Sequence, residues 1–224
     1  MSLNLRVLRT SLPPRDLFLG ALALLAISIF LPLWQIHLTA PQYPNGLSLF
    51  IYIDTIKGGE AGTLQNVNIL NHYIGMAPIH IESIPEFRFL KYILLSIVVY
   101  GLYIRYSNFN KKHLVFLLVV LSVFGLLCIL DFYLWLYDYG HNLDPMASIK
   151  IPGMSYQPPM FGEKNLLNFT VFSFPSYGVL TMCLSGLIIL LTIIFESRKD
   201  SRRTKDYEKK LKAEEAIHAT KNKA

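Results

Sequence analysis

The segment Leu114–Tyr137, LVFLLVVLSVFGLLCILDFYLWLY, is the longest apolar run in the chain and contains one charged residue, Asp131. A run of this length is typical of a membrane-spanning helix, because about 20 apolar residues cross the hydrocarbon core of a bilayer. Three other apolar runs, residues 16–36, 87–105 and 176–195, read in the same way. The sequence therefore predicts an all-α integral membrane protein with four transmembrane helices.

The composition agrees with a membrane protein. Of 224 residues, 53% are hydrophobic and only 16% are charged, which is too apolar for an ordinary soluble domain of this size. The formal net charge is +6, but 10 of the 21 Lys and Arg residues lie from Arg198 onward. The basic excess thus belongs to a charged tail, and we expect no nucleic-acid partner.

Basic residues beside the apolar runs predict the orientation. Residues 1–15, 106–113 and 196–224 are rich in Lys and Arg, whereas the long segments 37–86 and 138–175 are not. Cytoplasmic segments carry the excess of basic residues. We therefore expect a multi-pass bacterial inner-membrane protein in contact with lipid, with both termini in the cytoplasm. The two long segments become periplasmic loops that form a small mixed cap.

The first apolar run has an alternative interpretation. Residues 16–36 follow several arginines, as the apolar region of a signal peptide does, and Leu38-Thr39-Ala40 matches a cleavage site. The length of the run favours an uncleaved helix, with Pro32 loosening its last turns.

The first long loop contains a strand pattern and a helix pattern. Asn45-Gly46 predicts a turn, and residues 47–53 alternate between apolar and polar side chains, as a strand does. Apolar residues then recur at helical spacing from Leu64 to Ile74, with Thr63 as the N-cap. We expect this helix to end at Gly75, because glycine adopts the left-handed conformation that closes many helices.

Methionine and histidine gather in the predicted outer loops. Thioether and imidazole groups suit Cu(I) in an oxidising compartment, so copper is the candidate cofactor. The candidate metal ligands are His72, Met76, His141, Met154 and Met160. The alternative is a structural role, since methionine commonly fills gaps in a core. The four-residue spacing of His72 and Met76 favours one helical face, but Gly75 takes Met76 off that face.

No motif predicts catalysis. The apolar runs contain no histidine for haem, the two cysteines have no paired spacing, and no phosphate-binding loop is present. Asp131 falls near the outer interface, where a hydrogen-bonding role is favoured over a proton relay. We therefore assign no catalytic residue, and an enzyme or transporter is the weaker interpretation.

Several loop phrases resemble a known family. They are Tyr43–Leu47, Leu70–Met76, Asp138–Pro145, Ile151–Pro159 and Leu167–Phe169. In these phrases the chain resembles the NosB-type polytopic membrane proteins of bacterial clade II gene clusters for nitrous oxide reductase, an enzyme of denitrification. The resemblance implies an accessory protein for assembly, copper supply or electron delivery to a periplasmic copper enzyme, with a periplasmic or membrane protein as partner. The alternative is a structural subunit or docking scaffold that binds no ligand.

Overall fold

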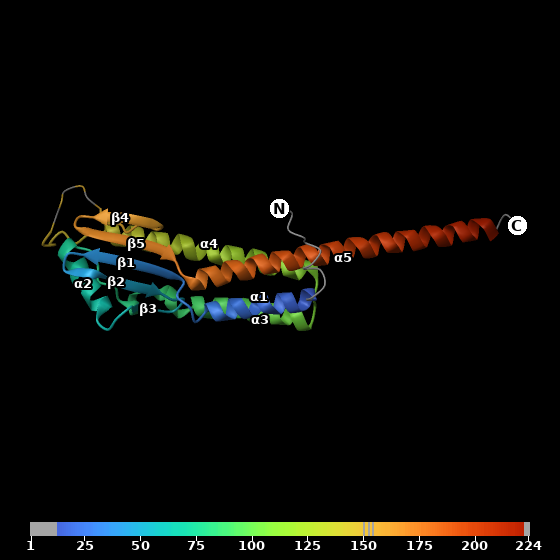
Figure 1. Cartoon of the computed structure of the whole chain (residues 1–224), viewed down its shortest axis with the longest axis horizontal. Coiled ribbons are helices and arrows are strands. Elements are labelled where there is room, and N and C mark those ends of the chain that lie inside the picture. The colour runs from blue at the N-terminus through green and yellow to red at the C-terminus, as the bar shows by residue number, and fades with distance from the viewer. Residues whose placement is uncertain (1–12, 150, 152, 154, 222–224) are drawn as a thin grey trace.

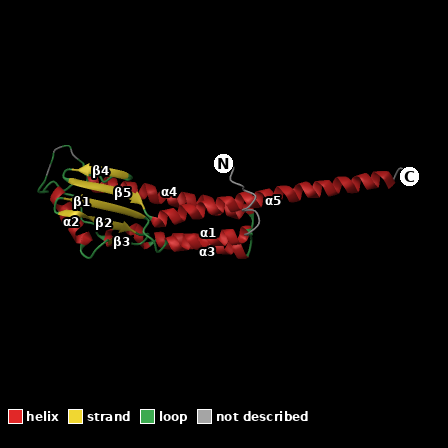
Figure 2. Cartoon of the chain, viewed as in Figure 1, coloured by secondary structure: helices red, strands yellow, loops and turns green. Residues whose placement is uncertain are grey.

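A computed structural model of the chain describes residues 13–149, 151, 153 and 155–221. A five-stranded sheet lies at one end of a bundle of helices, and the C-terminal helix projects past the other end (Figures 1 and 2). The helices are α1 (Pro14–Ser28), α2 (Thr63–Ile74), α3 (Leu90–Tyr106), α4 (Lys111–His141) and α5 (Tyr177–Lys221), with short 3₁₀ turns η2 (Ile81–Ser83) and η3 (Pro85–Arg88). The strands are β1 (Trp34–Ala40), β2 (Tyr43–Ile51), β3 (Ile56–Gly58), β4 (Gly162–Leu166) and β5 (Phe169–Pro175). The expected all-α class is therefore wrong, because the chain is a mixed α/β protein.

The expected count of four transmembrane helices is also wrong. Among the described residues, only α4 and α5 are long and apolar enough to cross a membrane, whereas α1 and α3 have 15 and 17 residues. Residues 16–36 do not form one helix, because α1 ends at Ser28 and β1 begins at Trp34. Pro32, between them, has no N–H to donate within a helix. The residues that follow alternate between apolar and polar side chains, which is the period of a strand.

The sheet joins the two long loops into one unit. Its strand order is β3-β2-β1-β5-β4, and every pairing is antiparallel. The central strand β1 pairs with β2 on one side and with β5 on the other, where Trp34 lies opposite Pro175. The strand expected over residues 47–53 is present within β2, but the turn expected at Asn45-Gly46 is wrong, because both residues lie inside this strand. The other four strands were not expected.

One face of the sheet is apolar. Trp34, Ile36 and Leu38 of β1 lie on this face, and their partners on β2 are Ile51, Leu49 and Leu47. The face also carries Ile56, Leu166, Phe169 and Val171, and the buried Ser173 lies opposite Ile36. The opposite face is more polar, and there His37 Nδ1 lies 2.8 Å from Ser48 Oγ. An apolar sheet face must be covered by another layer to be kept from water.

Helices α2 and α4 lie over the apolar face. Helix α4 has 31 residues and is about 46 Å long, which exceeds the roughly 30 Å hydrocarbon core of a bilayer. Its outer part runs beside the sheet, where the Phe132 and Trp34 rings have centroids 5.2 Å apart (Figure 1). Helix α2 packs on β2, and Val67, Leu70 and Ile74 are buried in the same apolar cluster as Leu47 and Leu49.

The bundle is held by close helix contacts below the sheet. Ser185 of α5 donates a hydrogen bond to the Ala21 carbonyl of α1 at 2.8 Å, and both residues are buried. At the outer end of α3, Lys91 Nζ lies 3.0 Å from Asp54 Oδ2 in the turn between β2 and β3. This hydrogen bond and the carboxylate charge raise the pKa of Lys91. The ion pair thus joins the turn between β2 and β3 to the start of α3.

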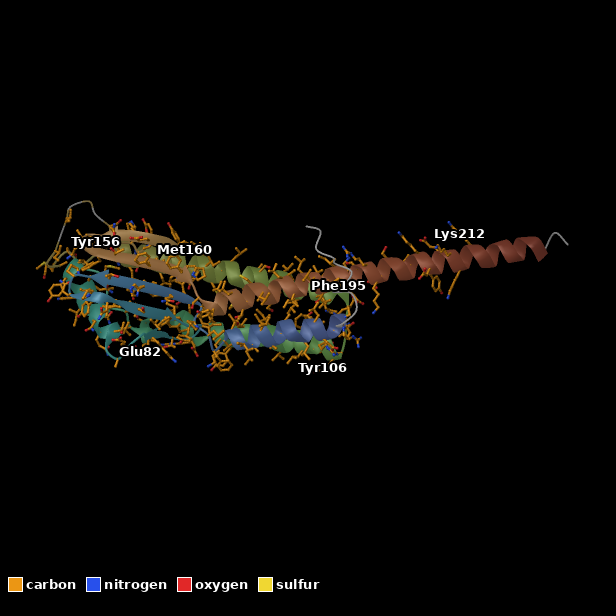
Figure 3. The ribbon with its side chains drawn as sticks, viewed as in Figure 1. Glu82, Tyr106, Tyr156, Met160, Phe195 and Lys212 are labelled. Atoms are coloured by element: carbon orange, nitrogen blue, oxygen red, sulfur yellow. The ribbon has the colours of Figure 1, made fainter. Side chains whose placement is uncertain are left out.

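Helix α5 begins directly after β5 and leaves the bundle at its far end. It continues as one helix through Lys221, and the segment beyond Phe195 projects alone, with Lys212 far along it (Figure 3). The described side chains from Arg198 to Lys210 are exposed. The charged tail is therefore helical throughout its described length.

The C-terminal end of α2 lies beside the loop that follows α4. As expected, it ends at Gly75, which has φ +80°. The expected cap is different, because Gly62 occupies the N-cap position and Thr63 is the first helical residue. The Gly75 carbonyl accepts a hydrogen bond from Asp144 N at 2.8 Å, so the end of α2 is bonded to the loop that follows α4.

Replacing Gly75 by Ala is expected to lower the thermal unfolding temperature more than replacing Gly62 by Ala. Both glycines have positive φ, so an alanine at either site costs about 1 kcal/mol in backbone strain. A Cβ at Gly75 would also lie 2.9 Å from the Ala147 Cβ, whereas one at Gly62 would meet nothing within 4 Å. Thermal unfolding of the purified protein in detergent measures both changes. Equal shifts would contradict the contact between the two loops.

Candidate functional site

A cavity of about 630 Å³ lies between the apolar face of the sheet and the layer formed by α2 and α4. Apolar side chains from all five strands form one wall of the cavity. Residues of α2, η3, α4 and α5 form the other walls. Its volume is within the range of about 300–1,000 Å³ that small-molecule sites occupy. The sheet and the helices therefore leave room for a ligand where they would otherwise pack together.

The cavity is long. Its wall on α4 extends from Leu118 in the bundle to Tyr139 beside the sheet, a distance of about 32 Å along the helix. The cavity is therefore elongated along α4.

Both tryptophans of the chain line the cavity. Trp34 Nε1 donates a hydrogen bond to Ser173 Oγ at 2.8 Å, which leaves the ring free to form apolar wall. Trp135 lies one turn beyond Phe132 on α4 and packs against Tyr139, with ring centroids 5.8 Å apart. All of the tryptophan fluorescence of the chain therefore comes from residues in the cavity wall.

Two acidic side chains are the charged groups of the described lining. Glu86 is placed by η3, and Asp131 is placed by α4. Glu86 Oε2 is buried and has no hydrogen-bond partner among the described residues. Asp131 is half-buried in the same lining. These carboxyl groups therefore remain available to a ligand.

Two helix glycines widen the cavity in the bundle. A Cβ built at Gly125 of α4 or at Gly186 of α5 would meet nothing within 4 Å, and both residues line the cavity. The space that a larger side chain would occupy at these positions is therefore part of the cavity.

The predicted metal ligands are only partly brought together. His72 is exposed and Met76 is buried, and both line a separate hollow of about 300 Å³ with the loop residues 142–145. Met76 also lines the large cavity, where it packs in the apolar cluster of α2.

The other predicted ligands lie elsewhere. His141 stacks on Tyr137 with ring centroids 4.0 Å apart, and its Nδ1 lies 2.9 Å from the Tyr137 carbonyl. The Met160 carbonyl accepts a hydrogen bond from Ser173 on β5, nearer to the bundle than Tyr156 (Figure 3). Met154 is outside the described residues. Within the described residues, no three His, Cys, Asp or Glu side chains gather as a metal site would require.

The sequence indicated parts of the cavity without revealing it. Asp131 was singled out as an interfacial carboxyl, but Glu86 was one acid among several in a loop. The alternation of apolar and polar residues from Trp34 to Leu38 was the signal for strand β1. The apolar run that precedes these residues made them look like the end of a helix.

Comparisons with known proteins give no relative. No family model matches the chain, and no curated protein matches it.

Proposed function

We propose that the chain is a membrane-anchored protein that binds one elongated apolar ligand in the cavity between its sheet and its helices. The observation that supports this function is the 630 Å³ cavity with almost entirely apolar walls. An acyl or isoprenoid chain is an elongated apolar ligand that such walls suit.

The membrane anchor rests on where α4 and α5 direct their apolar side chains. Only 22% and 28% of the residues in the most apolar windows of these helices are buried inside the chain. The core helix of a soluble protein is mostly buried, whereas a membrane helix presents its apolar surface to lipid. This exposure supports a location in a membrane, and we propose the bacterial inner membrane.

The charge distribution supports one orientation. The start of α1, the end of α3 and the start of α4 lie at the end of the bundle away from the sheet, where α5 also leaves it (Figure 1). These helix ends contain Arg15, Arg105 and Lys111, and the helix beyond Phe195 is basic. Since cytoplasmic segments carry the excess of Lys and Arg, this end faces the cytoplasm in our proposal. The sheet and the cavity's outer part then lie on the periplasmic side.

The orientation predicts which added cysteines react from outside the cell. With Cys128 and Cys183 replaced by Ala, Glu163→Cys on β4 is expected to react with a membrane-impermeant maleimide in intact cells. Ser201→Cys on α5 is expected to react only after the membrane is permeabilised. Both residues are exposed, so access depends on the side of the membrane and not on burial. The reverse pattern would overturn the orientation.

Ligand binding predicts quenching of tryptophan fluorescence. A brominated long-chain alcohol, added to the full chain in nanodiscs of unbrominated phosphatidylcholine, is expected to quench Trp34 and Trp135 from within the cavity. Gly125→Phe and Gly186→Phe place a ring in the open space and should each reduce the quenching by more than half. Gly20→Phe is the matched control, because Gly20 is also a helix glycine with an open Cβ position but does not line the cavity.

Quenching from lipid outside the cavity is common to all of these variants. Undiminished quenching in both Gly125→Phe and Gly186→Phe would therefore contradict binding inside the cavity.

A second proposal is the copper-supplying accessory role that the family resemblance implies. It is favoured by one observation, that His72 and Met76 line the same hollow beside the loop after α4. Replacing His72 by Ala and Met76 by Leu together is expected to abolish stoichiometric Cu(I) binding by the purified chain. His80→Ala is the control, because His80 is an exposed histidine near the same loop that does not line the hollow. Unchanged Cu(I) binding in the double variant would exclude this site.

A further inference from the structure

We propose that Glu86 and Asp131 make the cavity selective for a ligand whose polar end donates hydrogen bonds, namely a primary amine or a hydroxyl group on a single hydrocarbon chain. The inference rests on the proposed function and names the class of ligand that the cavity takes.

The two carboxyl groups reach the cavity from different elements. Glu86 lies in η3, a rigid turn opened by Pro85, just before α3 begins. Asp131 lies on α4, about 20 Å along that helix from Leu118 and about 12 Å from Tyr139. Asp131 therefore lies part-way along a long apolar cavity, with apolar wall on both sides of it, and Glu86 is the other acid of the same lining.

The unpartnered oxygen of Glu86 requires a donor. A carboxylate oxygen only accepts hydrogen bonds, and leaving such an atom buried without a partner is unfavourable. The described protein groups supply no donor to Oε2. A hydroxyl or ammonium group of a ligand that occupies the cavity would satisfy it.

The charges of the lining favour a donor and disfavour an anion. No Lys, Arg or His is present among the described residues that line the cavity. The neighbouring bases are directed elsewhere, since Arg88 Nη2 lies 3.5 Å from the Glu82 carbonyl and Lys91 pairs with Asp54. A ligand ammonium would supply the missing positive charge, whereas a sulfate or phosphate would face two carboxyl groups of its own sign.

The polar end must decide selectivity, because the hydrocarbon end does not. A chain dissolved in the bilayer is already out of water, and lipid tails are as apolar as the leucine-rich wall of the cavity. Transfer between the two therefore changes the burial of apolar surface only slightly. Hydrogen bonds and charge at Glu86 and Asp131 are the interactions that the bilayer interior does not offer.

The test compares three probes with the same chain length: an alkyl amine, an alkyl alcohol and an alkyl sulfate. Each competes with the bound brominated alcohol for the full chain in phosphatidylcholine nanodiscs, and recovery of tryptophan fluorescence measures displacement. The amine and the alcohol are expected to displace it at concentrations at least tenfold below that of the sulfate. In a variant with Glu86→Gln and Asp131→Asn, the ratio should fall to threefold or less.

Glu82→Gln is the matched control, because Glu82 is an exposed acid near Glu86 that does not line the cavity. It should keep the wild-type ratio. Equal displacement by all three probes in the wild-type protein would overturn the selectivity but leave the proposed function intact. An unchanged ratio in the Glu86→Gln and Asp131→Asn variant would show that other groups select the ligand. Failure of the brominated alcohol itself to bind in the cavity would instead reject the proposed function, and the selectivity with it.

Discussion

The structure depends on covering an apolar sheet face that lies beyond the end of a helix bundle. Ten apolar side chains on five strands point to one side, and water cannot be left against them without a large cost in free energy. Helix α4 covers much of this face, because it is longer than the hydrocarbon core of a bilayer and continues beside the sheet. Helix α2 covers the outer part. Two helices are too few to fill the space under five twisted strands, so a cavity remains at the centre of the fold.

Local patterns in the sequence predicted the elements whose formation is decided locally. Helix α2 follows from the helical spacing of Val67, Leu70 and Ile74, and its end follows from Gly75. Strand β2 follows from its alternation. By contrast, β1 follows an apolar run with no change in hydropathy between the two. The first helix was therefore predicted to end at residue 36, whereas α1 ends at Ser28. Strand β5 depends on pairing with β1, more than 120 residues away in the chain, and β4 in turn pairs with β5. No local pattern specifies a partner so distant.

The candidate site was harder to predict than the elements. Asp131 is conspicuous because it is the one acid in an apolar run, but Glu86 becomes important only when η3 turns it toward the same space. The Met and His residues show the opposite case. They were all predicted to lie in the outer loops, on the same side of the membrane. In the structure, however, the Met160 backbone is hydrogen-bonded to Ser173, and the His141 ring contacts the Tyr137 carbonyl at a separate position. A shared loop environment therefore does not imply a shared site.

The pairing of β1 with β5 has a consequence for how the protein is made. The Trp34 indole and the Ser173 hydroxyl that it contacts are 139 residues apart, and α2, α3 and α4 all lie between them in the chain. During synthesis β1 emerges early, and its second neighbour arrives only just before α5. The pairing of β1 with β5 can therefore form only after the helices of the opposite wall, α2 and α4, have been synthesised.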